Sequence, residues 1–402
     1  MKILTQNIEK PNSHTLQGYG EYRALGKALK MKTSEVIEEM KKSKLVGRGG
    51  ASFPTGLKWD FASRVEAQPK YLLVNADEGE PGTFKDKVIL EQDPHRLLEG
   101  MIIAGYAIGA VSGTIYLRAE YPHAYEILEG AIAEAQESGF LGDDILGSGF
   151  SFRINVARGA GAYVCGEETA LIESIEGFRG NPRLKPPYPT VAGFRQKPTV
   201  INNVETISNV PTILEKGGEW FSKIGSPQNP GTKLMSVSGF VNKPGVYEIE
   251  TGMSLRTFLD TCCGGVVGKF KAVLPGGLST HFLTDLDVAL DVPSMNKAGS
   301  SLGSGAVIVL NETADMVDVS RNCLEFFCHE SCGKCTPCRE GTKQALDIVE
   351  RLAEGEEVDL GLLSELYEVM KDTAICGLGQ AALNPVMSAI EKFRPEFDAC
   401  VR

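Results

Sequence analysis

The sequence has little that would suit a membrane or a nucleic acid. Its longest apolar run, residues 101–111, is interrupted by Gly105 and Gly109 and is about half of the roughly 20 residues that a membrane-spanning helix needs. We therefore expect a buried helix there and no direct insertion into a membrane. The 41 Lys and Arg residues are outnumbered by 52 Asp and Glu residues, so the chain lacks the basic excess on which nucleic-acid binding depends.

The N-terminus also lacks the pattern of a secretory signal, because residues 1–7 hold no sustained apolar region before a small-residue cleavage site. We expect a cytoplasmic protein. Hydrophobic residues make up 42% of the chain and charged residues 23%, which is ordinary for a globular protein and excludes disorder as the main state. A length of 402 residues exceeds that of a usual single domain and predicts two or three.

Changes of pattern along the chain divide it into three expected domains. The first, residues 1–225, alternates short strands with helical patterns and glycine-rich turns, which favours an α/β fold. A polar Pro/Gly stretch, residues 226–231, predicts a linker. The second domain, residues 226–310, has the short strands and turns of a small β-rich fold, and the third, residues 311–402, is mostly helical.

Local signals place several elements within the first domain. Strands are expected at residues 71–74, 114–117 and 152–156. A helix is expected to begin at Pro94, with Asp93 as its N-terminal cap, because proline fits the first helical position and aspartate accepts unpaired N–H groups there.

A cluster of cysteines near the C-terminus predicts metal or redox chemistry. The chain has 10 cysteines, and a cytoplasmic protein of this size is not expected to use them as a disulfide framework. Cys332, Cys335 and Cys338 follow the spacing C-x2-C-x2-C, which brings three thiolates to one side of a loop, as a 4Fe-4S cluster requires. Cys376, in a glycine-rich turn, is the natural fourth ligand, and Cys328 is its rival. Zinc is the alternative metal, although structural zinc sites usually pair two C-x2-C units.

Three glycine-rich segments of the first domain are typical of loops that bind phosphates and flat rings. They are residues 47–59, residues 75–82 and residues 158–169. Free backbone N–H groups at the glycines can face an anion, and the second and third segments directly follow predicted strands, where ligands of α/β sheets bind. Their spacing matches neither the G-x-G-x-x-G dinucleotide fingerprint nor the P-loop, so each segment alone is a weak signal and could equally be a connection.

These segments together closely resemble the flavin-binding, NADH-oxidising subunit of respiratory complex I, which is the NADH dehydrogenase flavoprotein 1 family, and its relatives in NAD-linked hydrogenases and formate dehydrogenases. The resemblance extends from about residue 44 to the C-terminus. The shared motifs occur in the family's order: residues 47–59, 75–82, 159–176 and 330–339, with shorter agreement at residues 183–189 and 202–206.

The resemblance implies a fold, a set of cofactors and a set of binding residues. The implied fold is α/β, with a Rossmann-like FMN domain, a ubiquitin-like β-grasp domain and a C-terminal helical bundle that carries an iron–sulfur cluster. The family's FMN contacts fall on Gly47, Gly49, Lys58, Asn75, Asp77, Glu78, Tyr163, Gly166, Glu167, Asn202, Asn203 and Thr206. Its 4Fe-4S ligands fall on Cys332, Cys335, Cys338 and Cys376, which decides against Cys328.

The resemblance also implies that NAD(H) stacks on the flavin. Phe53, Phe61 and Tyr188 would surround the adenine, with Glu80, Glu168 and Lys185 near the nicotinamide, ribose or phosphates. NADH would pass a hydride to FMN, and single electrons would then reach the cluster. Glu80 and Glu168 are the candidate catalytic residues, and a carboxylate at Glu168 would repel the extra phosphate of NADPH. Ser52 replaces the family's usual glycine, and Tyr188 its commoner phenylalanine.

The implied partners are a thioredoxin-like 2Fe-2S subunit and a larger iron–sulfur subunit with several clusters. Glu80 follows the respiratory form of its loop, which favours complex I, and such a complex would allow this subunit to lie at the inner face of the cell membrane. The alternative is a diaphorase subunit of a cytoplasmic hydrogenase or formate dehydrogenase, including electron-bifurcating ones. A non-catalytic zinc-binding scaffold is a distant third interpretation.

Overall fold

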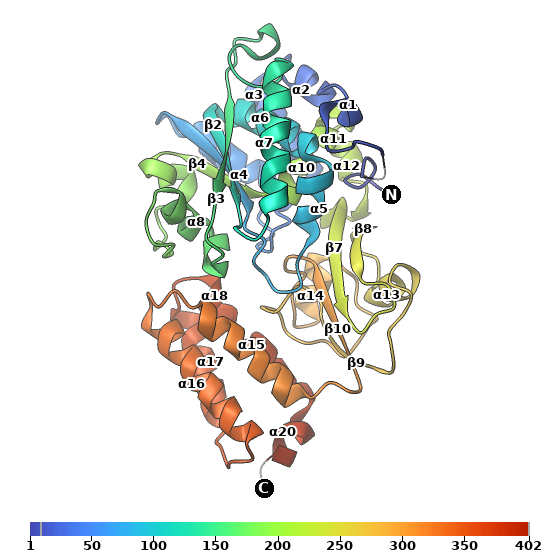
Figure 1. Ribbon diagram of the computed structural model, residues 1–402, viewed down its shortest axis with the longest axis vertical. Coiled ribbons are helices and arrows are strands. Elements are labelled where there is room, and N and C mark those ends of the chain that lie inside the picture. Colours follow the sequence, from blue (N-terminus) through green and yellow to red (C-terminus); the bar gives the residue numbers. More distant parts are fainter. Residues whose placement is uncertain (9, 401–402) are drawn as a thin grey trace.

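A parallel sheet forms the centre of the first part of the computed structural model, which describes residues 1–8 and 10–400 (Figure 1). Its strands lie in the order β3-β2-β1-β4, and every pairing between them is parallel. They are β1 (Lys70–Ala76), β2 (Ala110–Leu117), β3 (Arg153–Arg158) and β4 (Thr199–Asn203). The predicted strands are therefore confirmed, except that Phe152 precedes β3. Because β1 and β4 run side by side, Asn75 and Asn203 are register partners at the same edge of the sheet.

Helices and short 3-10 turns surround this sheet. The helices are α1 (Leu16–Tyr19), α2 (Arg23–Ala28), α3 (Thr33–Ser43), α4 (Thr55–Arg64), α5 (Lys85–Gln92), α6 (Pro94–Ile108), α7 (Pro122–Glu137), α8 (Glu168–Ile175), α9 (Pro189–Ala192), α10 (Val204–Ser208), α11 (Val210–Lys216) and α12 (Gly218–Phe221). The 3-10 turns are η1 (Ile145–Gly147), η2 (Tyr163–Gly166) and η3 (Phe194–Gln196).

Helix α6 is the buried helix that the apolar run predicts, and it packs against β1 and β2. It ends at Ile108, because Gly109 takes a left-handed conformation (φ 72°) and β2 begins at the next residue. Pro94 occupies the first turn and Asp93 the N-cap position, as expected, but the capping role predicted for the Asp93 side chain is wrong. The Asp93 carboxylate makes no capping bond and instead accepts a hydrogen bond of 2.9 Å from Arg96 Nε.

The middle part is a mixed sheet with the strand order β8-β7-β10-β9. Its elements are β5 (Gly225–Ser226), β6 (Asn229–Pro230), β7 (Thr232–Gly239), β8 (Gly245–Glu250), α13 (Leu255–Thr261), β9 (Phe270–Leu274), α14 (Val292–Lys297) and β10 (Ala306–Asn311). The central strands β7 and β10 are parallel, while β8 and β9 are antiparallel to their neighbours. The linker expected at residues 226–231 is wrong, because β5 pairs with β6 there and Asn229 is fully buried.

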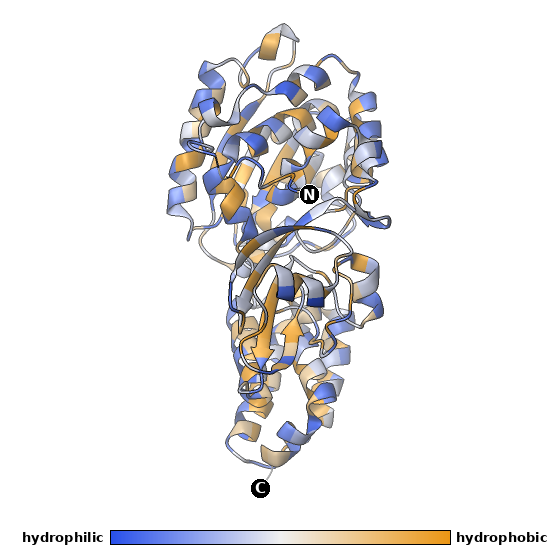
Figure 2. Ribbon diagram, turned by 90° about the vertical axis from the view of Figure 1, so that its right-hand side faces the viewer, coloured by the Kyte–Doolittle hydropathy of each residue, from blue (hydrophilic) through white to orange (hydrophobic). Residues whose placement is uncertain are grey.

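The C-terminal part is helical, as predicted. Its helices are α15 (Met316–Glu330), α16 (Thr336–Ala353), α17 (Gly361–Thr373), α18 (Gly377–Ala381), α19 (Asn384–Lys392) and α20 (Arg394–Cys400). Helix α15 packs on α16 and α19, and α17 packs on α16 and α18. Figure 2 shows apolar residues concentrated in the strands, while the helices mix apolar and polar residues.

The two faces of β1 belong to different hydrophobic cores. Leu72 and Val74 pack in the core of the first part, together with α6. Leu73 points the other way and shares a core with Phe327 of α15 and Leu378 of α18. The sheet edge and the cysteine-bearing helices are therefore held against each other. None of the helices in residues 1–8 and 10–400 combines the length and apolar character needed to span a lipid bilayer.

Candidate functional site

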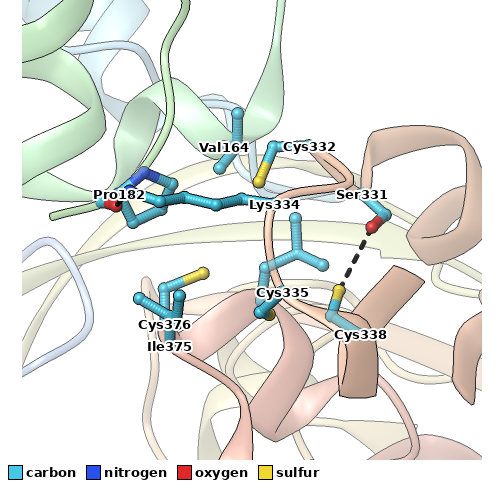
Figure 3. A pocket seen from close by; sticks show the side chains of 10 residues that line it. Val164, Pro182, Ser331, Cys332, Lys334, Cys335, Cys338, Ile375 and Cys376 are labelled. Atoms are coloured by element: carbon cyan, nitrogen blue, oxygen red, sulfur yellow. Dashed lines mark hydrogen bonds between the residues drawn. The ribbon is translucent and has the colours of Figure 1, made fainter. Parts of the chain in front are cut away.

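Four cysteine side chains line one cavity between the first part and the C-terminal helices (Figure 3). Cys332 and Cys335 lie in the loop between α15 and α16, Cys338 lies in the first turn of α16, and Cys376 directly precedes α18. The loop can turn this tightly because Gly333 adopts a left-handed conformation (φ 76°). The four predicted ligands are therefore brought together.

The sequence rival for the fourth ligand lies elsewhere. Cys328 is near the end of α15 and is not among the described residues that line this cavity. Cys376 lines the cavity on the side opposite the C-x2-C-x2-C loop, as Figure 3 shows. The geometry thus separates two candidates that the sequence pattern alone left open.

The arrangement of the thiols around one space suits a cluster with several irons. Among the described residues, no three His, Cys, Asp or Glu side chains converge closely enough to hold one metal ion. The thiols instead surround a space, as a 4Fe-4S cluster requires, because each of its irons takes its own thiolate. Burial, together with the neighbouring thiols, raises the pKa of Cys338 to about 11. A bound cation would reverse this effect and favour the thiolate form.

The cavity is closed on one side by residues of the first part. Val164 of η2 and Pro182 line it together with the cysteines. Arg179 Nη2 donates a hydrogen bond of 3.1 Å to the carbonyl oxygen of Cys332. The third glycine-rich segment therefore lies directly against the cysteine cavity.

The second and third glycine-rich segments are joined at the edge of the sheet. Asn75 Nδ2 donates to the carbonyl oxygen of Gly166 at 2.8 Å, and Asn75 Oδ1 accepts from the backbone N–H of Asp77 at 3.1 Å. On the neighbouring strand, Asn202 Oδ1 accepts from Trp59 Nε1 at 2.9 Å, and Asn203 Nδ2 donates to Asp86 at 2.6 Å. The amides at both strand ends thus fix the loops around them.

The first glycine-rich segment lies on the end of β4. The backbone N–H of Arg48, between Gly47 and Gly49, donates to Thr206 Oγ1 at 2.8 Å. A β-carbon on Gly49 would lie 3.0 Å from the Asn203 side chain, so any larger residue would have to push that side chain away. All three predicted loops therefore meet at one edge of the sheet.

Asp77 presents a buried acceptor without a partner in this region. Its Oδ2 atom has no hydrogen bond to any described residue, and its side chain is almost fully buried. Burial raises the pKa of this carboxyl to about 7. β-Carbons at Gly79 and Gly166 would lie 3.2 and 3.3 Å from Oδ2, so these glycines leave the oxygen open. A buried acceptor left unpaired is costly, and it fits a bound ligand that donates a hydrogen bond.

Two glutamates of the second segment already have protein partners. Glu78 accepts hydrogen bonds from the N–H groups of Asp86 and Lys87 at the start of α5, at 2.6 and 3.0 Å. Glu80 accepts from the Tyr163 hydroxyl at 2.6 Å and from the backbone N–H of Ser279 at 2.7 Å. Burial raises the pKa of Glu80 and raises that of Glu78 to about 7.

A second group of charges lies at the start of α8. Glu167 caps this helix by accepting from the N–H groups of Thr169 and Ala170. Glu168 lies 3.4 Å from Lys58 Nζ and 2.9 Å from Lys185 Nζ. Burial acts to raise the pKa of Glu168, but the two lysines outweigh it and lower the pKa. Glu168 is therefore ionised near neutral pH.

The predicted aromatic residues form an exposed apolar surface beside these charges. Phe53, Phe61 and Tyr188 are 43%, 50% and 57% exposed. The Phe53 and Phe61 rings lie 6.5 Å apart, and Lys58 Nζ lies 5.9 Å from the Phe53 ring centre. Tyr188 precedes α9, which packs against α4, the helix of Phe61. Large apolar side chains left exposed in this way mark a binding surface.

Sequence reasoning missed two residues that shape the site. Ser279 holds Glu80, and the Glu330 carboxylate accepts from the N–H of Tyr163 at 3.0 Å. Glu330 lies within the cysteine motif and could have been suspected from it. Ser279 follows a glycine pair in the middle part, 199 positions from its partner, and no local pattern points to it.

Comparison with known proteins is consistent with this geometry. Residues 40–212 match the family described as the Nuo51 FMN-binding domain, and residues 318–400 match the NADH-ubiquinone oxidoreductase-F iron-sulfur binding region. The chain is 49% identical to an NADH-quinone oxidoreductase subunit of Rhizobium meliloti (strain 1021), over 99% of this chain and 97% of that protein. It is 47% identical to NADP-reducing hydrogenase subunit HndC of Solidesulfovibrio fructosivorans, over 100% and 84%.

A solved structure is similar over the whole chain. It is the NAD+-reducing [NiFe]-hydrogenase in the air-oxidized state, with a TM-score of 0.87 and 36% sequence identity. The match covers 100% of this chain and 67% of that one. The cysteine cavity draws its cysteines from one matched region, and Val164 and Pro182 from the other.

Proposed function

Because the chain belongs to the family of FMN-binding, iron–sulfur NADH oxidoreductase subunits found in NADH-quinone oxidoreductases, we propose that it is the electron-input subunit of respiratory complex I. It is an FMN- and iron–sulfur-dependent NADH dehydrogenase. The observation that carries this function is the four-cysteine cavity lying against the third glycine-rich segment, since electron transfer needs the flavin and the cluster close together.

Bound FMN would supply the chemistry of hydride acceptance and one-electron release, and a 4Fe-4S cluster held by the four cysteines would supply a one-electron acceptor. The protein supplies position, charge and exclusion of water. Cys332, Cys335, Cys338 and Cys376 would hold the cluster, and their common cavity supports this assignment.

The residues meeting at the edge of the sheet would hold FMN. They are Gly47, Gly49, Lys58, Asn75, Asp77, Glu78, Tyr163, Gly166, Glu167, Asn202, Asn203 and Thr206. The unpaired Asp77 Oδ2 beside Gly79 and Gly166 supports a ligand that donates a hydrogen bond there. The side chains of Glu78 and Glu167 are engaged by α5 and α8, so they would act mainly by fixing the backbone around the ligand.

NADH would bind over the exposed aromatic surface. Phe53, Phe61 and Tyr188 offer ring faces for the adenine, and Lys185 offers positive charge for the phosphates. Glu80 would orient the nicotinamide, held in turn by Tyr163 and Ser279. Glu168, kept ionised by Lys58 and Lys185, would reject the extra phosphate of NADPH.

The three parts of the chain would be domains with bounds near residues 1–225, 226–310 and 311–402. The parallel sheet with surrounding helices supports a Rossmann-like description of the first. In the second, a central parallel pair flanked by antiparallel strands, with α13 following β8, supports a ubiquitin-like β-grasp fold. The third would carry the cluster.

The partners would be a thioredoxin-like 2Fe-2S subunit and a larger subunit with several clusters. Such an assembly would place the chain in the cytoplasm, at the inner face of the cell membrane. A diaphorase role in a hydrogenase is the second candidate, because subunit HndC of an NADP-reducing hydrogenase aligns with the entire chain at 47% identity.

Purified protein with quantified flavin, iron and acid-labile sulfide tests the proposed site. We expect FMN and one 4Fe-4S cluster per chain in the wild type, loss of the cluster in Cys376→Ser, and full retention in Cys328→Ser. A cluster that survives in Cys376→Ser but not in Cys328→Ser would contradict the proposed ligand set. Bound zinc with no flavin would contradict the function itself.

A further inference from the structure

We propose that Lys334 and Arg179 form a clasp across the cysteine cavity that makes the iron–sulfur cluster easier to reduce. This inference rests on the proposed function, because it takes Cys332, Cys335, Cys338 and Cys376 as the cluster ligands. It concerns residues outside that ligand set.

Lys334 lies between two of the cysteines in sequence and spans the cavity in space. Its side chain lines the cavity, and its Nζ atom donates a hydrogen bond of 2.6 Å to the carbonyl oxygen of Pro182. Figure 3 shows the side chain stretched toward Pro182, with Cys332 on one side of it and Cys376 on the other. The aliphatic stem of Lys334 therefore covers the side of the cavity that faces the first part.

Arg179 makes the reciprocal contact from the first part. Its Nη2 atom donates a hydrogen bond of 3.1 Å to the carbonyl oxygen of Cys332. One cation from each part thus bonds to a carbonyl oxygen of the other part, at adjacent points of the cysteine loop. The two contacts fasten the loop to the segment that follows α8.

The charge of the clasp has a consequence for electron transfer. A 4Fe-4S cluster with four thiolates is anionic, and reduction adds one more negative charge. A fixed cation nearby stabilises the reduced state more than the oxidised state, so it raises the reduction potential. In these two contacts both clasp cations bond to neutral carbonyl oxygens. No carboxylate of a described residue neutralises them there, so their positive charge can act on the cavity.

The clasp also lies where electrons would arrive. Pro182 and Val164, which border the cavity with Lys334, belong to the matched FMN-binding region. A higher cluster potential on this side would favour the one-electron step away from the flavin. Lys334 and Arg179 are therefore positioning and tuning residues rather than catalytic ones.

The test is a reductive titration followed by EPR on the full-length protein with its cluster loaded. Lys334→Met keeps the length of the stem and removes the charge, while Lys334→Arg keeps the charge. At the potential that half-reduces the wild-type cluster, we expect Lys334→Met to lower the ratio of reduced to oxidised cluster roughly fivefold, and Lys334→Arg to restore it. Lys343→Met, on the exposed side of α16, is the matched control and should match the wild type.

Arg179→Gln gives an independent reading if Lys334→Met loses its cluster, and it should shift the ratio in the same direction. The proposal is overturned if Lys334→Met is fully loaded with cluster and shows the wild-type ratio of reduced to oxidised cluster. If Lys334→Met cannot be loaded, the same result in Arg179→Gln overturns it. Absence of any 4Fe-4S signal from the wild-type protein would instead contradict the proposed function, so the two failures are distinguishable.

Discussion

At the scale of single residues, the proposed flavin site contains a buried carboxyl, Asp77, whose pKa is raised by burial. Burial raises the pKa of Asp77 to about 7, whereas an unfolded aspartate titrates near about 3.9. Between these values the folded protein keeps a proton that the unfolded chain has lost, so rising pH destabilises the ligand-free protein. Glu78 and Glu99, whose pKa values burial also raises to about 7, act in the same direction.

We therefore expect Asp77→Asn to weaken the pH dependence of stability in the FMN-free protein. The unfolding temperature should fall between about pH 5 and about pH 8 in both proteins. The fall should be smaller in the variant than in the wild type, because one of the contributing carboxyls is gone. If the unfolding temperature falls equally in both proteins, Asp77 is not protonated in the folded state.

The same substitution should weaken FMN binding about tenfold, because an amide oxygen is a poorer acceptor than a carboxylate for a donor of the ligand. Fluorescence titration of the apoprotein with FMN measures this. Asp143→Asn is a suitable control, since Asp143 is exposed and pairs with Arg153 at the surface. Unchanged affinity in Asp77→Asn would remove Asp77 from the flavin site.

Glu168 is expected to govern the choice between NADH and NADPH. We expect Glu168→Gln to lower the ratio of kcat/KM for NADH over NADPH at least roughly tenfold, because repulsion of the extra phosphate is lost. The exposed Glu126→Gln on α7 should leave the ratio unchanged. A ratio that is the same in Glu168→Gln and wild type would show that Glu168 does not face the adenosine ribose.

Single residues also mark the limit of what the sequence could predict. The candidates within motifs, such as Asn75 and Glu168, were predicted because the glycine-rich segments that carry them resemble the motifs of a known family. Ser279 could not be found, because its role depends on a contact with Glu80 that spans 199 positions. Only the folded chain brings the two together.

At the scale of elements, a buried ionic network joins α5, α10 and β7 behind the glycine-rich loops. Lys85 Nζ lies 2.7 Å from Asp86 and 2.8 Å from Glu205, and all three side chains are buried. Glu205 Oε1 also accepts from the N–H of Leu234 at 2.8 Å. Burial acts to raise the pKa of Glu205, but nearby cations, led by Lys85, lower it.

Removing the central carboxylate should therefore be costly. We expect Glu205→Gln to lower the free energy of unfolding by about 3 kcal/mol, because it removes one of the two buried carboxylates that pair with Lys85. Urea unfolding measures this difference. Glu38→Gln breaks an exposed pair with Lys41 and should have no measurable effect. If the free energy of unfolding falls as little in Glu205→Gln as in the control, the network does not hold these elements together.

Elements were predicted well where one local pattern dominates. The strands β1 and β2 and helix α6 follow from their apolar runs. The linker at residues 226–231 was wrong, because Asn229 is held by distant residues: its carbonyl oxygen accepts from the Thr251 hydroxyl. Asp93 does hold the N-cap position, but its side chain makes no capping bond because Arg96 competes for the carboxylate. In both cases a specific side-chain partner overrode the local signal.

At the scale of the whole molecule, the cluster-bearing helices share a core with the sheet. Leu73 of β1 and Tyr116 of β2 pack in the same core as Phe327 of α15 and Leu378 of α18. We expect residues 311–402 expressed alone to melt at a lower temperature than the full chain and to lose the cluster in air, because this apolar face would be exposed. Calorimetry and iron analysis test this. A fragment as stable as the full chain would show that the shared core is unimportant.

The central claim is that one chain passes electrons from NADH through FMN to a 4Fe-4S cluster. The most direct test is to mix anaerobic, cofactor-loaded protein with NADH and to record the flavin absorbance and the EPR spectrum together. We predict that the flavin band bleaches and that a reduced 4Fe-4S signal then appears, and that the signal is absent from Cys376→Ser. A flavin that stays oxidised, or a cluster that never becomes reduced although the flavin bleaches, would contradict this claim.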